Sequence, residues 1–263
     1  MKIGIIGAGN MGGAIARGLA QNTAHTIAVS CPNRHGELDA LRSQYPAIET
    51  STDNACVAAN ADIIILAVKP WLADAVMQSL GNVIDYQQQV IASVVAATSL
   101  DHIESYAGDS HVSPAVFRII PNIAITHSQS MTFIAAKNAT NEQIDTICGI
   151  FDQLGKTMLV EERLMDAGTA LASCGIAYAM RYVRAAMEGG VELGFTASQS
   201  LEIVLQTMTG AIATLADGNE HPEAAIDRVT TAGGITIRGL NAMERNGFST
   251  AVIEGLKASL PQR

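Results

Sequence analysis

A glycine-rich run near the start of the chain, Gly7-Ala8-Gly9-Asn10-Met11-Gly12, has the spacing G-x-G-x-x-G. It follows the apolar run 2–6 and precedes a helical pattern. In this context Gly7 permits a tight turn, Gly9 lets the backbone approach a pyrophosphate, and Gly12 lets the helix pack closely against the strand. The amides and dipole of the helix N-terminus then stabilise the anion. The motif therefore predicts a dinucleotide site; the alternative is a glycine-rich turn without a ligand.

The residues after the next apolar run, 26–30, indicate which dinucleotide binds. An NAD site usually carries Asp or Glu at this point, where the carboxylate accepts hydrogen bonds from the ribose hydroxyls. This chain has Cys31-Pro32-Asn33-Arg34 instead, with a guanidinium and polar groups that suit a 2′-phosphate. We therefore predict NADPH over NADH. The alternative interpretation of Arg34 is a solvated loop cation.

A third candidate segment follows the most apolar run of the chain. Residues 61–68 are apolar on both faces, as in the central strand of a parallel sheet, and they lead into Val68-Lys69-Pro70. The carboxyl end of such a strand opens into the ligand crevice. From spacing alone, Lys69 either contacts the cofactor there or is an exposed surface lysine.

The second half of the chain contains Val229-Thr230-Thr231-Ala232-Gly233-Gly234-Ile235-Thr236, followed by a helical pattern over 234–246. Thr230 or Thr231 can cap that helix, and the paired glycines leave backbone amides uncovered at its N-terminus. Such amides form a small anion site that suits a carboxylate. Thr236 lies in the first turn, where its hydroxyl can reach the same ligand. The alternative is an ordinary capped helix start.

The first half of the chain alternates between apolar runs and helical patterns, which predicts crossover connections and a parallel sheet. We expect an α/β fold with an N-terminal Rossmann-like, doubly wound, mostly parallel sheet. Strands are expected at 2–6, 26–30, 61–68, 89–96, 118–120 and 131–135, and helices at 11–21, 36–44, 72–80 and 141–154.

The alternation ends after about residue 141, and helical patterns then cover 161–188, 197–217, 222–229, 234–246 and 249–259. The expected domains are therefore a dinucleotide-binding Rossmann domain over 1–160 and an all-α domain over 161–263. Residues 164–187 and 201–216 carry too few charges for a small domain that is fully solvated. A second copy would cover this apolar surface, so we expect a homodimer formed through the helical domain.

Composition narrows the class of protein. The chain has 263 residues, of which 48% are hydrophobic and 16% charged, so it can bury a sizeable core. A net charge of −9 without a basic run disfavours nucleic acid and membrane surfaces as partners. No run is long and apolar enough for a membrane helix. Four scattered cysteines, Cys31, Cys56, Cys148 and Cys174, lack Cys-x-x-Cys spacing and predict reduced core thiols of a cytoplasmic protein, with no metal site.

Residues 229–244 resemble the signature of the Δ1-pyrroline-5-carboxylate reductases: a small-residue run, Gly-Gly-x-Thr, and a helix that ends in an acidic residue. The resemblance spans nearly the whole chain in order, and further segments similar to the family lie at 7–12, 67–70, 118–122, 188–194 and 244–248. Two departures stand out. Ala232 replaces the proline that often precedes the paired glycines, and Ile123-Ala124 replaces Thr-Pro.

The resemblance implies the last step of proline biosynthesis, in which NADPH transfers hydride to the C=N carbon of 1-pyrroline-5-carboxylate and gives L-proline. Thr236 is then the catalytic candidate: it hydrogen-bonds the imine nitrogen and orients the ring, with a water relaying the proton. The substrate-binding set is Val229, Thr230, Thr231, Gly233, Gly234 and Thr236. No metal is expected, because hydride chemistry belongs to the cofactor.

The resemblance also implies where NADP(H) binds and how copies assemble. The family forms dimers, some of which assemble further, and we expect an active site between one chain's nucleotide domain and helices of both chains. The cofactor set comprises the first glycine loop, the ends of four predicted strands and one loop amide: Ile6, Gly7, Ala8, Gly9, Asn10, Met11, Gly12, Cys31, Asn33, Arg34, Asn54, Ala67, Val68, Lys69, Pro70, Val94, Val95, Ala96 and Ala97.

Two alternatives remain at this point. One is another Rossmann reductase of imines or β-hydroxyacids, but the β-hydroxyacid enzymes use a helix lysine several residues after a glycine. Here Gly175 is followed by Arg181 and Arg184, and no lysine lies between 157 and 256. The other alternative is a non-catalytic protein that senses NADP. Turnover of pyrroline-5-carboxylate with NADPH or NADH separates the three.

Overall fold

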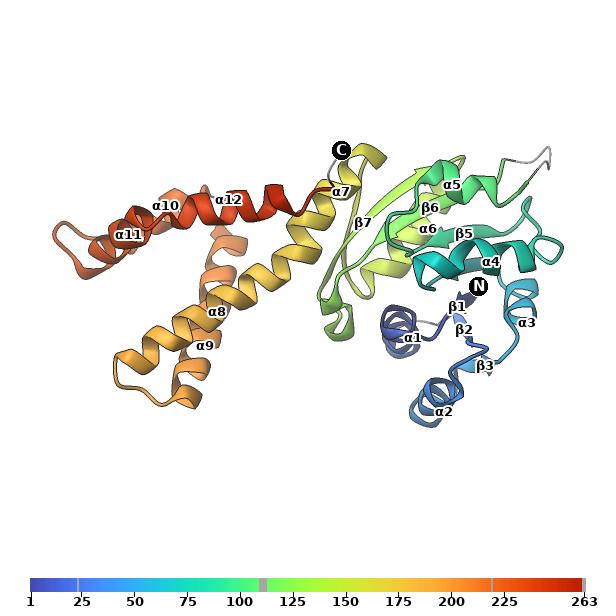
Figure 1. Cartoon of the computed structure of the whole chain (residues 1–263), viewed down its shortest axis with the longest axis horizontal. Helices are drawn as coiled ribbons and strands as arrows, with labels where there is room; N and C mark the ends of the chain where they lie inside the picture. The colour runs from blue at the N-terminus through green and yellow to red at the C-terminus, as the bar shows by residue number, and fades with distance from the viewer. Residues whose placement is uncertain (23, 109–112, 219, 262–263) are drawn as a thin grey trace. The chain divides into compact units, whose positions relative to one another are not determined.

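The computed structural model describes residues 1–22, 24–108, 113–218 and 220–261 (Figure 1). The chain divides into two compact units, Met1–Ser173 and Cys174–Arg263. The first unit is built on a sheet, and the second consists of helices.

The first unit contains an eight-stranded sheet with the order β3-β2-β1-β4-β5-β6-β7-β8. Every neighbouring pair is parallel except β6 and β7, which confirms the doubly wound, mostly parallel fold. The strands are β1 (Lys2–Ile6), β2 (Thr26–Ser30), β3 (Glu49–Ser51), β4 (Ile63–Leu66), β5 (Val90–Ser93), β6 (Val116–Ile120), β7 (Ser130–Lys137) and β8 (Gly155–Leu159).

Two apolar clusters sandwich this sheet, because successive side chains of a strand point to opposite faces. Ile3 and Ile5 of β1 pack with α1 (Asn10–Asn22), α2 (His35–Gln44) and α6 (Asn141–Asp152). Ile6 belongs to the opposite cluster, with α3 (Asn54–Ala59), α4 (Pro70–Leu80) and α5 (Leu100–Ser105). All four residues of β4 are buried, as expected for a central strand covered on both faces.

Five short elements of this unit were not expected from the sequence: β3, α3, α5, the 3₁₀ turn η1 (Ile123–His127) and β8. The strands β3 and β8 have no buried residue and therefore no hydrophobic alternation to detect. The helices α3 and α5 are six residues long, and their side-chain caps, Asp53 and Ser99, were the only local signal. The expected strand 89–96 is also shorter, since β5 ends at Ser93.

The helical pattern expected over 161–188 is confirmed from Glu162 onward, although the segment is not one regular α-helix. The chain forms a 3₁₀ turn η2 (Glu162–Leu164), a short helix α7 (Met165–Gly168), a π-helical stretch η3 (Thr169–Cys174) and then α8 (Gly175–Glu192). The segment α7 packs on the sheet, since Met165 is fully buried and a Cβ at Gly168 would lie 2.8 Å from the ring of Phe133. The division into two compact units falls after Ser173, while a functional boundary near residue 160 stays a prediction.

The second unit contains α8, α9 (Ala197–Gly218), α10 (Pro222–Arg228), α11 (Ile235–Arg245) and α12 (Phe248–Ala258). Tyr178 of α8 donates a hydrogen bond to the carbonyl of Gly255 at 3.1 Å and also pairs with the hydroxyl of Ser259. None of the described residues of α8, α11 and α12 is buried. Large apolar side chains such as Leu193 and Ile212 are exposed. This unit thus presents apolar surface that its own fold leaves uncovered.

Neither unit contains, within the described ranges, a helix long and apolar enough to cross a membrane. The four cysteines are free thiols. The expectation of core thiols was wrong for Cys56, which is exposed, and the other three are half-buried.

Lys137 of β7 fixes α5 to the sheet through two carboxylates. Its Nζ lies 2.6 Å from Asp101 Oδ1 and 2.5 Å from Glu104 Oε2. Hydrogen bonds from Lys137 and then Asn138 hold the pKa of Glu104 below its usual value of 4.5. A carboxyl whose folded-state pKa is lowered contributes stability above its unfolded-state pKa and loses it as the pH falls through the folded value.

We therefore expect Lys137→Gln to raise the pKa of Glu104 toward 4.5. The loss of stability between pH 4.5 and the lower folded-state value should become shallower in the variant. Carbon-13 NMR titration of the glutamate carboxyls and urea unfolding at several pH values measure both effects. An unchanged Glu104 titration would contradict the assignment of the shift to Lys137.

Candidate functional site

The glycine run connects β1 to α1 at the carboxyl edge of the sheet. Gly7 has φ +111° and donates its amide to the carbonyl of Ser30 at 2.8 Å. A Cβ at Gly7 would lie 2.6 Å from the carbonyl oxygen of Ala67. Both the left-handed conformation and the close approach of β4 therefore require glycine at this position.

Gly9 and Gly12 differ sharply in their surroundings. A Cβ at Gly12 would lie 2.0 Å from the carbonyl oxygen of Gly7, so this glycine lets α1 pack against the turn. At Gly9 no atom lies within 4 Å of the position that a Cβ would take. The carbonyl of Gly9 accepts from the amide of Gly13 at 2.7 Å and closes the first helical turn. Glycine at position 9 therefore leaves open space beside the N-terminus of α1.

That space is part of a cavity of about 430 Å³ along the carboxyl edge of β1, β2, β4 and β5. The cavity brings together thirteen residues of the expected cofactor set: Gly7, Ala8, Gly9, Asn10, Met11, Cys31, Arg34, Ala67, Val68, Lys69, Pro70, Val94 and Ala96. The carboxyl ends of parallel strands are the usual ligand sites of such sheets.

Arg34 is the cationic residue where β2 leads into α2. Its side chain is about half exposed, and its Nη1 lies 2.9 Å from Glu37 Oε1. Cys31, also on the cavity wall, is held by a hydrogen bond from its amide to the carbonyl of Ser51 at 3.1 Å. An exposed ion pair of this kind contributes little to stability, so Arg34 is free to exchange Glu37 for a phosphate.

Six residues of the expected cofactor set do not line this cavity. Ile6 and Val95 are core residues, and Gly12 is buried against Gly7. Asn54 accepts a hydrogen bond from the hydroxyl of Ser30 at 2.8 Å and so joins α3 to the end of β2. The remaining two are exposed: Asn33 follows β2, and Ala97 lines a neighbouring cavity. Their roles stay predictions.

The cavity also has walls that the sequence did not indicate. These are Ala14 of α1, Leu72 of α4, and three residues of the 3₁₀ turn η1 (Ile123–His127), namely Ile123, Ile125 and Thr126. The departure Ile123-Ala124 was the only signal, and Ile123 is 60% exposed. The apolar residue that replaces threonine therefore lies at the cavity itself.

The neighbouring cavity, of about 400 Å³, shares Pro70 and Ala96 with the first. Asp74 Oδ1 in its wall lies 2.8 Å from His102 Nε2 and 3.0 Å from the hydroxyl of Tyr106. These hydrogen bonds, that of His102 first, lower the pKa of the Asp74 carboxyl. Burial, followed by the hydrogen bond to Asp74, raises the pKa of the Tyr106 phenol. This cluster links α4 to α5 beside the 94–99 loop.

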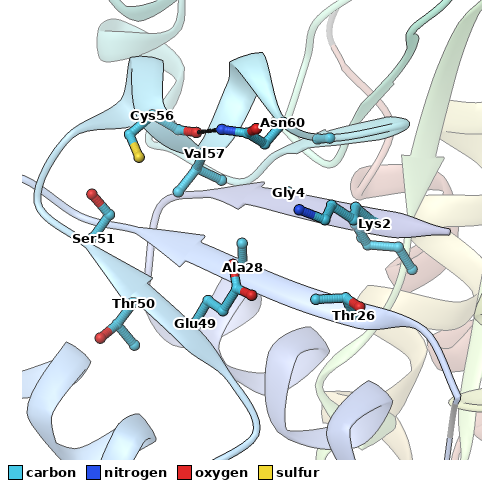
Figure 2. A pocket seen from close by; sticks show the side chains of 12 residues that line it. Lys2, Gly4, Thr26, Ala28, Glu49, Thr50, Ser51, Cys56, Val57 and Asn60 are labelled. Carbon is cyan, nitrogen blue, oxygen red and sulfur yellow. Dashed lines mark hydrogen bonds between the residues drawn. The ribbon is translucent and has the colours of Figure 1, made fainter.

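A further cavity of about 250 Å³ lies on the face of β1–β3 next to α3 (Figure 2). It contains none of the expected site residues and is lined by Lys2, Thr26, Glu49 and Cys56, among others. Lys2 and Thr26 begin their strands, so this hollow is not at the carboxyl edge where ligands of such sheets bind. Cys56 and Val57 of α3 also line it.

In the second unit, the expected substrate residues surround the start of α11. Thr231, Ala232, Gly233 and Gly234 form a turn in which the amide of Gly234 donates to the carbonyl of Thr231 at 2.9 Å. Gly233 has φ +71°, the value that a turn with glycine in its third position requires. The expectation that Gly234 leaves its amide uncovered was therefore wrong.

The cap of α11 also differs from the expectation. Gly234 is the N-cap and provides no side-chain cap, while the hydroxyl of Thr230 donates to the carbonyl of Asp227 at 3.1 Å, at the end of α10. The first-turn amides of α11, including that of Thr236, consequently lack a side-chain cap. Thr236 is exposed, and so is Val229. This helix start is open to a ligand, as an anion site needs.

Two family models match the chain. One, described as pyrroline-5-carboxylate reductase dimerisation, matches residues 162–262. The other, described as NADP oxidoreductase coenzyme F420-dependent, matches residues 2–97. The second match lies within the sheet unit, and the first covers the helical unit together with the last segment of the sheet unit.

Similar proteins cover nearly the whole chain. Pyrroline-5-carboxylate reductase 1 of Dictyostelium discoideum is 34% identical over 98% of this chain, which spans 48% of that longer protein. Pyrroline-5-carboxylate reductase of Synechocystis sp. is 34% identical, with 98% of this chain and 96% of that protein covered. The crystal structure of Plasmodium falciparum pyrroline carboxylate reductase with NADP bound superposes with a TM-score of 0.86 at 24% identity, covering 98% and 95% of the two chains.

Proposed function

The chain belongs to the pyrroline-5-carboxylate reductase family, and on that premise we propose that it reduces the C=N bond of 1-pyrroline-5-carboxylate to give L-proline, with NADPH as reductant. The observation that carries this proposal is the cavity along the carboxyl edge of the sheet, where the open space at Gly9 meets the N-terminus of α1.

The residues around that cavity fit a dinucleotide phosphate. Glycine at position 9 leaves room for a pyrophosphate, and the first-turn amides of α1 favour its negative charge. Arg34, which pairs with Glu37 at the surface, would hold the 2′-phosphate of the adenosine ribose instead. Lys69, Val94 and Ala96 line the cavity at the ends of β4 and β5, where the nicotinamide would lie. When bound, NADPH supplies the hydride that adds to the C=N carbon.

In the helical unit, the first turn of α11 holds the substrate carboxylate. The uncapped amides of this turn favour an anion, and no side-chain cap competes for them. Thr236 donates its hydroxyl to the ring nitrogen, which needs positive character when hydride adds to the adjacent carbon. A threonine hydroxyl is a poor acid, so its first task is to orient the ring, and a water relays the proton.

Turnover measured with both cofactors tests the proposal. The purified protein is mixed with 1-pyrroline-5-carboxylate and either NADPH or NADH, and both nicotinamide absorbance and L-proline are followed. We expect stoichiometric L-proline and faster turnover with NADPH. Nucleotide binding without turnover would favour an NADP sensor, whereas NADP⁺-dependent oxidation of a β-hydroxyacid would favour the other reductase class.

Arg34→Ala tests the cofactor preference. Loss of the guanidinium should lower kcat/KM for NADPH by about 10-fold, corresponding to one charge-assisted contact, and leave that for NADH within about 2-fold. Glu37→Gln, which removes only the charge of the exposed partner of Arg34, should not weaken NADPH binding. An equal loss with both cofactors in Arg34→Ala would show that this residue does not select the 2′-phosphate.

We also propose a cytoplasmic homodimer that forms through the helical unit. The uncovered apolar surface of α8, α11 and α12 supports the dimer, as does the dimerisation model matched over 162–262. Four free thiols support a reducing compartment. Sedimentation measures the assembly, including whether dimers associate further; a fully active monomer would contradict it.

A further inference from the structure

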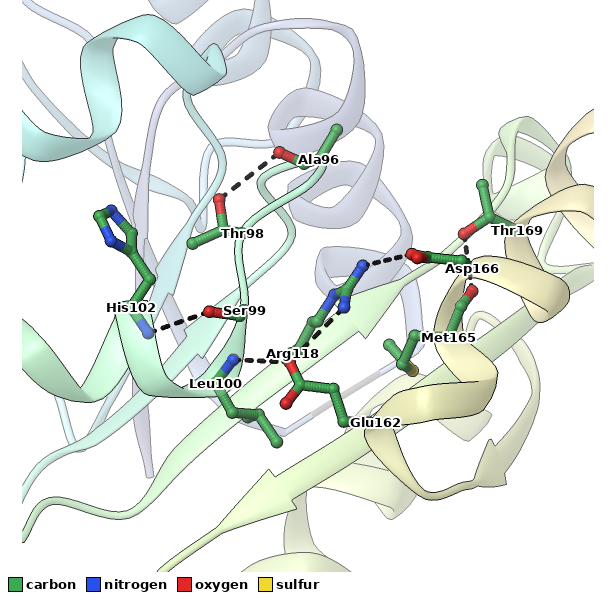
Figure 3. A network of polar contacts seen from close by, with 10 residues as sticks. All are labelled: Ala96, Thr98, Ser99, Leu100, His102, Arg118, Glu162, Met165, Asp166 and Thr169. Atoms are coloured by element: carbon green, nitrogen blue, oxygen red, sulfur yellow. Dashed lines mark hydrogen bonds and ion pairs between the residues drawn. The ribbon is translucent and has the colours of Figure 1, made fainter. Parts of the chain in front are cut away.

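Arg118 is a buried cation that the proposed chemistry does not use. It lies in the middle of β6, between Ser93 of β5 and Ala135 of β7, and is 8% exposed. Its guanidinium meets two carboxylates from the segment that follows the sheet (Figure 3): Nη2 is 2.9 Å from Asp166 Oδ1 and Nη1 is 3.5 Å from Glu162 Oε1.

Glu162 contacts α5 as well as Arg118. Its Oε1 also accepts a hydrogen bond from the backbone amide of Leu100 at 2.7 Å (Figure 3). Leu100 is the first residue of α5, so its amide is one of the donors that no intrahelical carbonyl can satisfy. Ser99 caps the same turn by accepting from the amide of His102 at 3.2 Å. The start of α5 is thus fixed by Glu162, which Arg118 holds in place.

The contact between Glu162 and the Leu100 amide, here called the anchor, lies at the end of the loop 94–99. This loop forms a wall of the cofactor cavity through Val94 and Ala96. Its backbone is strained, because Ala97 has φ +58°. Residues other than glycine adopt this backbone conformation rarely and only when their surroundings enforce it. A dinucleotide lies across the strand ends, so a loop after β5 is beside the nicotinamide when Arg34 after β2 is beside the adenosine.

The network is poorly suited to stabilising the fold. Within the described residues, the buried Nε of Arg118 has no hydrogen-bond partner. Burying a cation costs desolvation free energy that its ion pairs often do not recover, and apolar residues of similar size are often equally stable at such sites. The two carboxylates are more exposed than the guanidinium of Arg118. Water can therefore solvate the carboxylates in a variant that lacks the guanidinium. The network therefore contributes more to the position of the α5 start than to the free energy of unfolding.

We propose that Arg118 is a positioning residue, which through Glu162 and the Leu100 amide holds the 94–99 loop against the nicotinamide end of the bound cofactor. This inference rests on the proposed function for its kinetic consequence, although the anchoring itself does not. Because the phosphate loop at 7–12 is separate from the network, Arg118 should affect the rate of hydride transfer more than cofactor affinity.

Arg118→Met tests the proposal by removing the cation while keeping an apolar side chain. We expect kcat to fall about 10-fold, since small displacements of reacting groups are costly, while the Kd for NADPH stays within about 3-fold. Glu162→Ala should lower kcat by a similar factor. The double variant should lose no more kcat than either single variant, because all three variants interrupt the same series of contacts from Arg118 to Leu100. Glu162→Gln keeps an acceptor for the Leu100 amide and should retain most of kcat.

Lys137→Gln is the matched control, because it removes ion pairs from the same helix, α5, but leaves the contact of Glu162 with the Leu100 amide in place. It should leave kcat within about 2-fold. Unchanged kcat in a folded Arg118→Met protein would overturn the positioning role, as would a loss explained entirely by weaker NADPH binding.

Hydrogen–deuterium exchange provides a readout that needs no turnover. Exchange at the amides of 94–100, Leu100 above all, should rise about 10-fold in Arg118→Met and Glu162→Ala and stay unchanged at 7–12. Unchanged exchange at 94–100 overturns the anchor even if the protein proves inactive. Inactive wild-type protein with the expected exchange pattern overturns the proposed function alone and leaves the anchor supported.

Discussion

Gly9→Ala should weaken NADPH binding by about 100-fold, equivalent to about 2.7 kcal/mol, without lowering the free energy of unfolding. The structure provides both halves of this expectation. No atom lies within 4 Å of the new methyl group, and the φ of Gly9 is outside the left-handed region, so alanine fits the folded chain. The methyl group would, however, enter the cavity where the backbone must approach the pyrophosphate.

Two other glycine-to-alanine variants bracket this result. At Gly12 the methyl group would lie 2.0 Å from the carbonyl oxygen of Gly7, so Gly12→Ala should destabilise the fold by several kcal/mol. At Gly149 of α6 there is also open space, but this position does not line the cofactor cavity. Gly149→Ala should therefore neither destabilise the fold nor weaken NADPH binding. Calorimetric titration and urea unfolding separate the three. Normal NADPH affinity in Gly9→Ala would place the pyrophosphate elsewhere.

The elements that were predictable from the sequence are those whose burial is written into their composition. The strand β4 is four consecutive large aliphatic residues, and β1 and β2 match the expected bounds to the residue. The strand β3, Glu-Thr-Ser, has no such signature, because it is an edge strand held by backbone pairing with β2. Local composition thus reveals the centre of the sheet and conceals its edges.

The same limit applies to the candidate site. The residues of one contiguous motif could be placed together, because the turn from β1 to α1 determines their arrangement. Ile123, Ile125 and Thr126 reach the cavity only through the order of the strands, which a local pattern does not specify. The two carboxylate partners of Arg118, Glu162 and Asp166, are 44 and 48 residues away along the chain, so spacing in the sequence could not predict the network.

Thr236→Val should lower kcat for 1-pyrroline-5-carboxylate by about 100-fold, at the lower end of what a group acting on proton position contributes. Valine has the shape of threonine without the hydroxyl, so the ring nitrogen would lose its hydrogen bond while the backbone of α11 keeps its amides. Thr236 is exposed in the described chain, and the free energy of unfolding should change by less than about 0.5 kcal/mol. Stopped-flow NADPH oxidation measures the effect.

The conservative replacement makes the test specific. Thr236→Ser keeps the hydroxyl and should remain within about 10-fold of the wild-type kcat, whereas Thr146→Val, on an exposed turn of α6 where the hydroxyl donates to the carbonyl of Glu142, should have no effect. Because the amides that hold the carboxylate are untouched, KM for the substrate should rise less than kcat falls. A Thr236→Val protein that keeps full kcat and gains only in KM would reduce Thr236 to a binding contact and leave water alone to protonate the ring nitrogen.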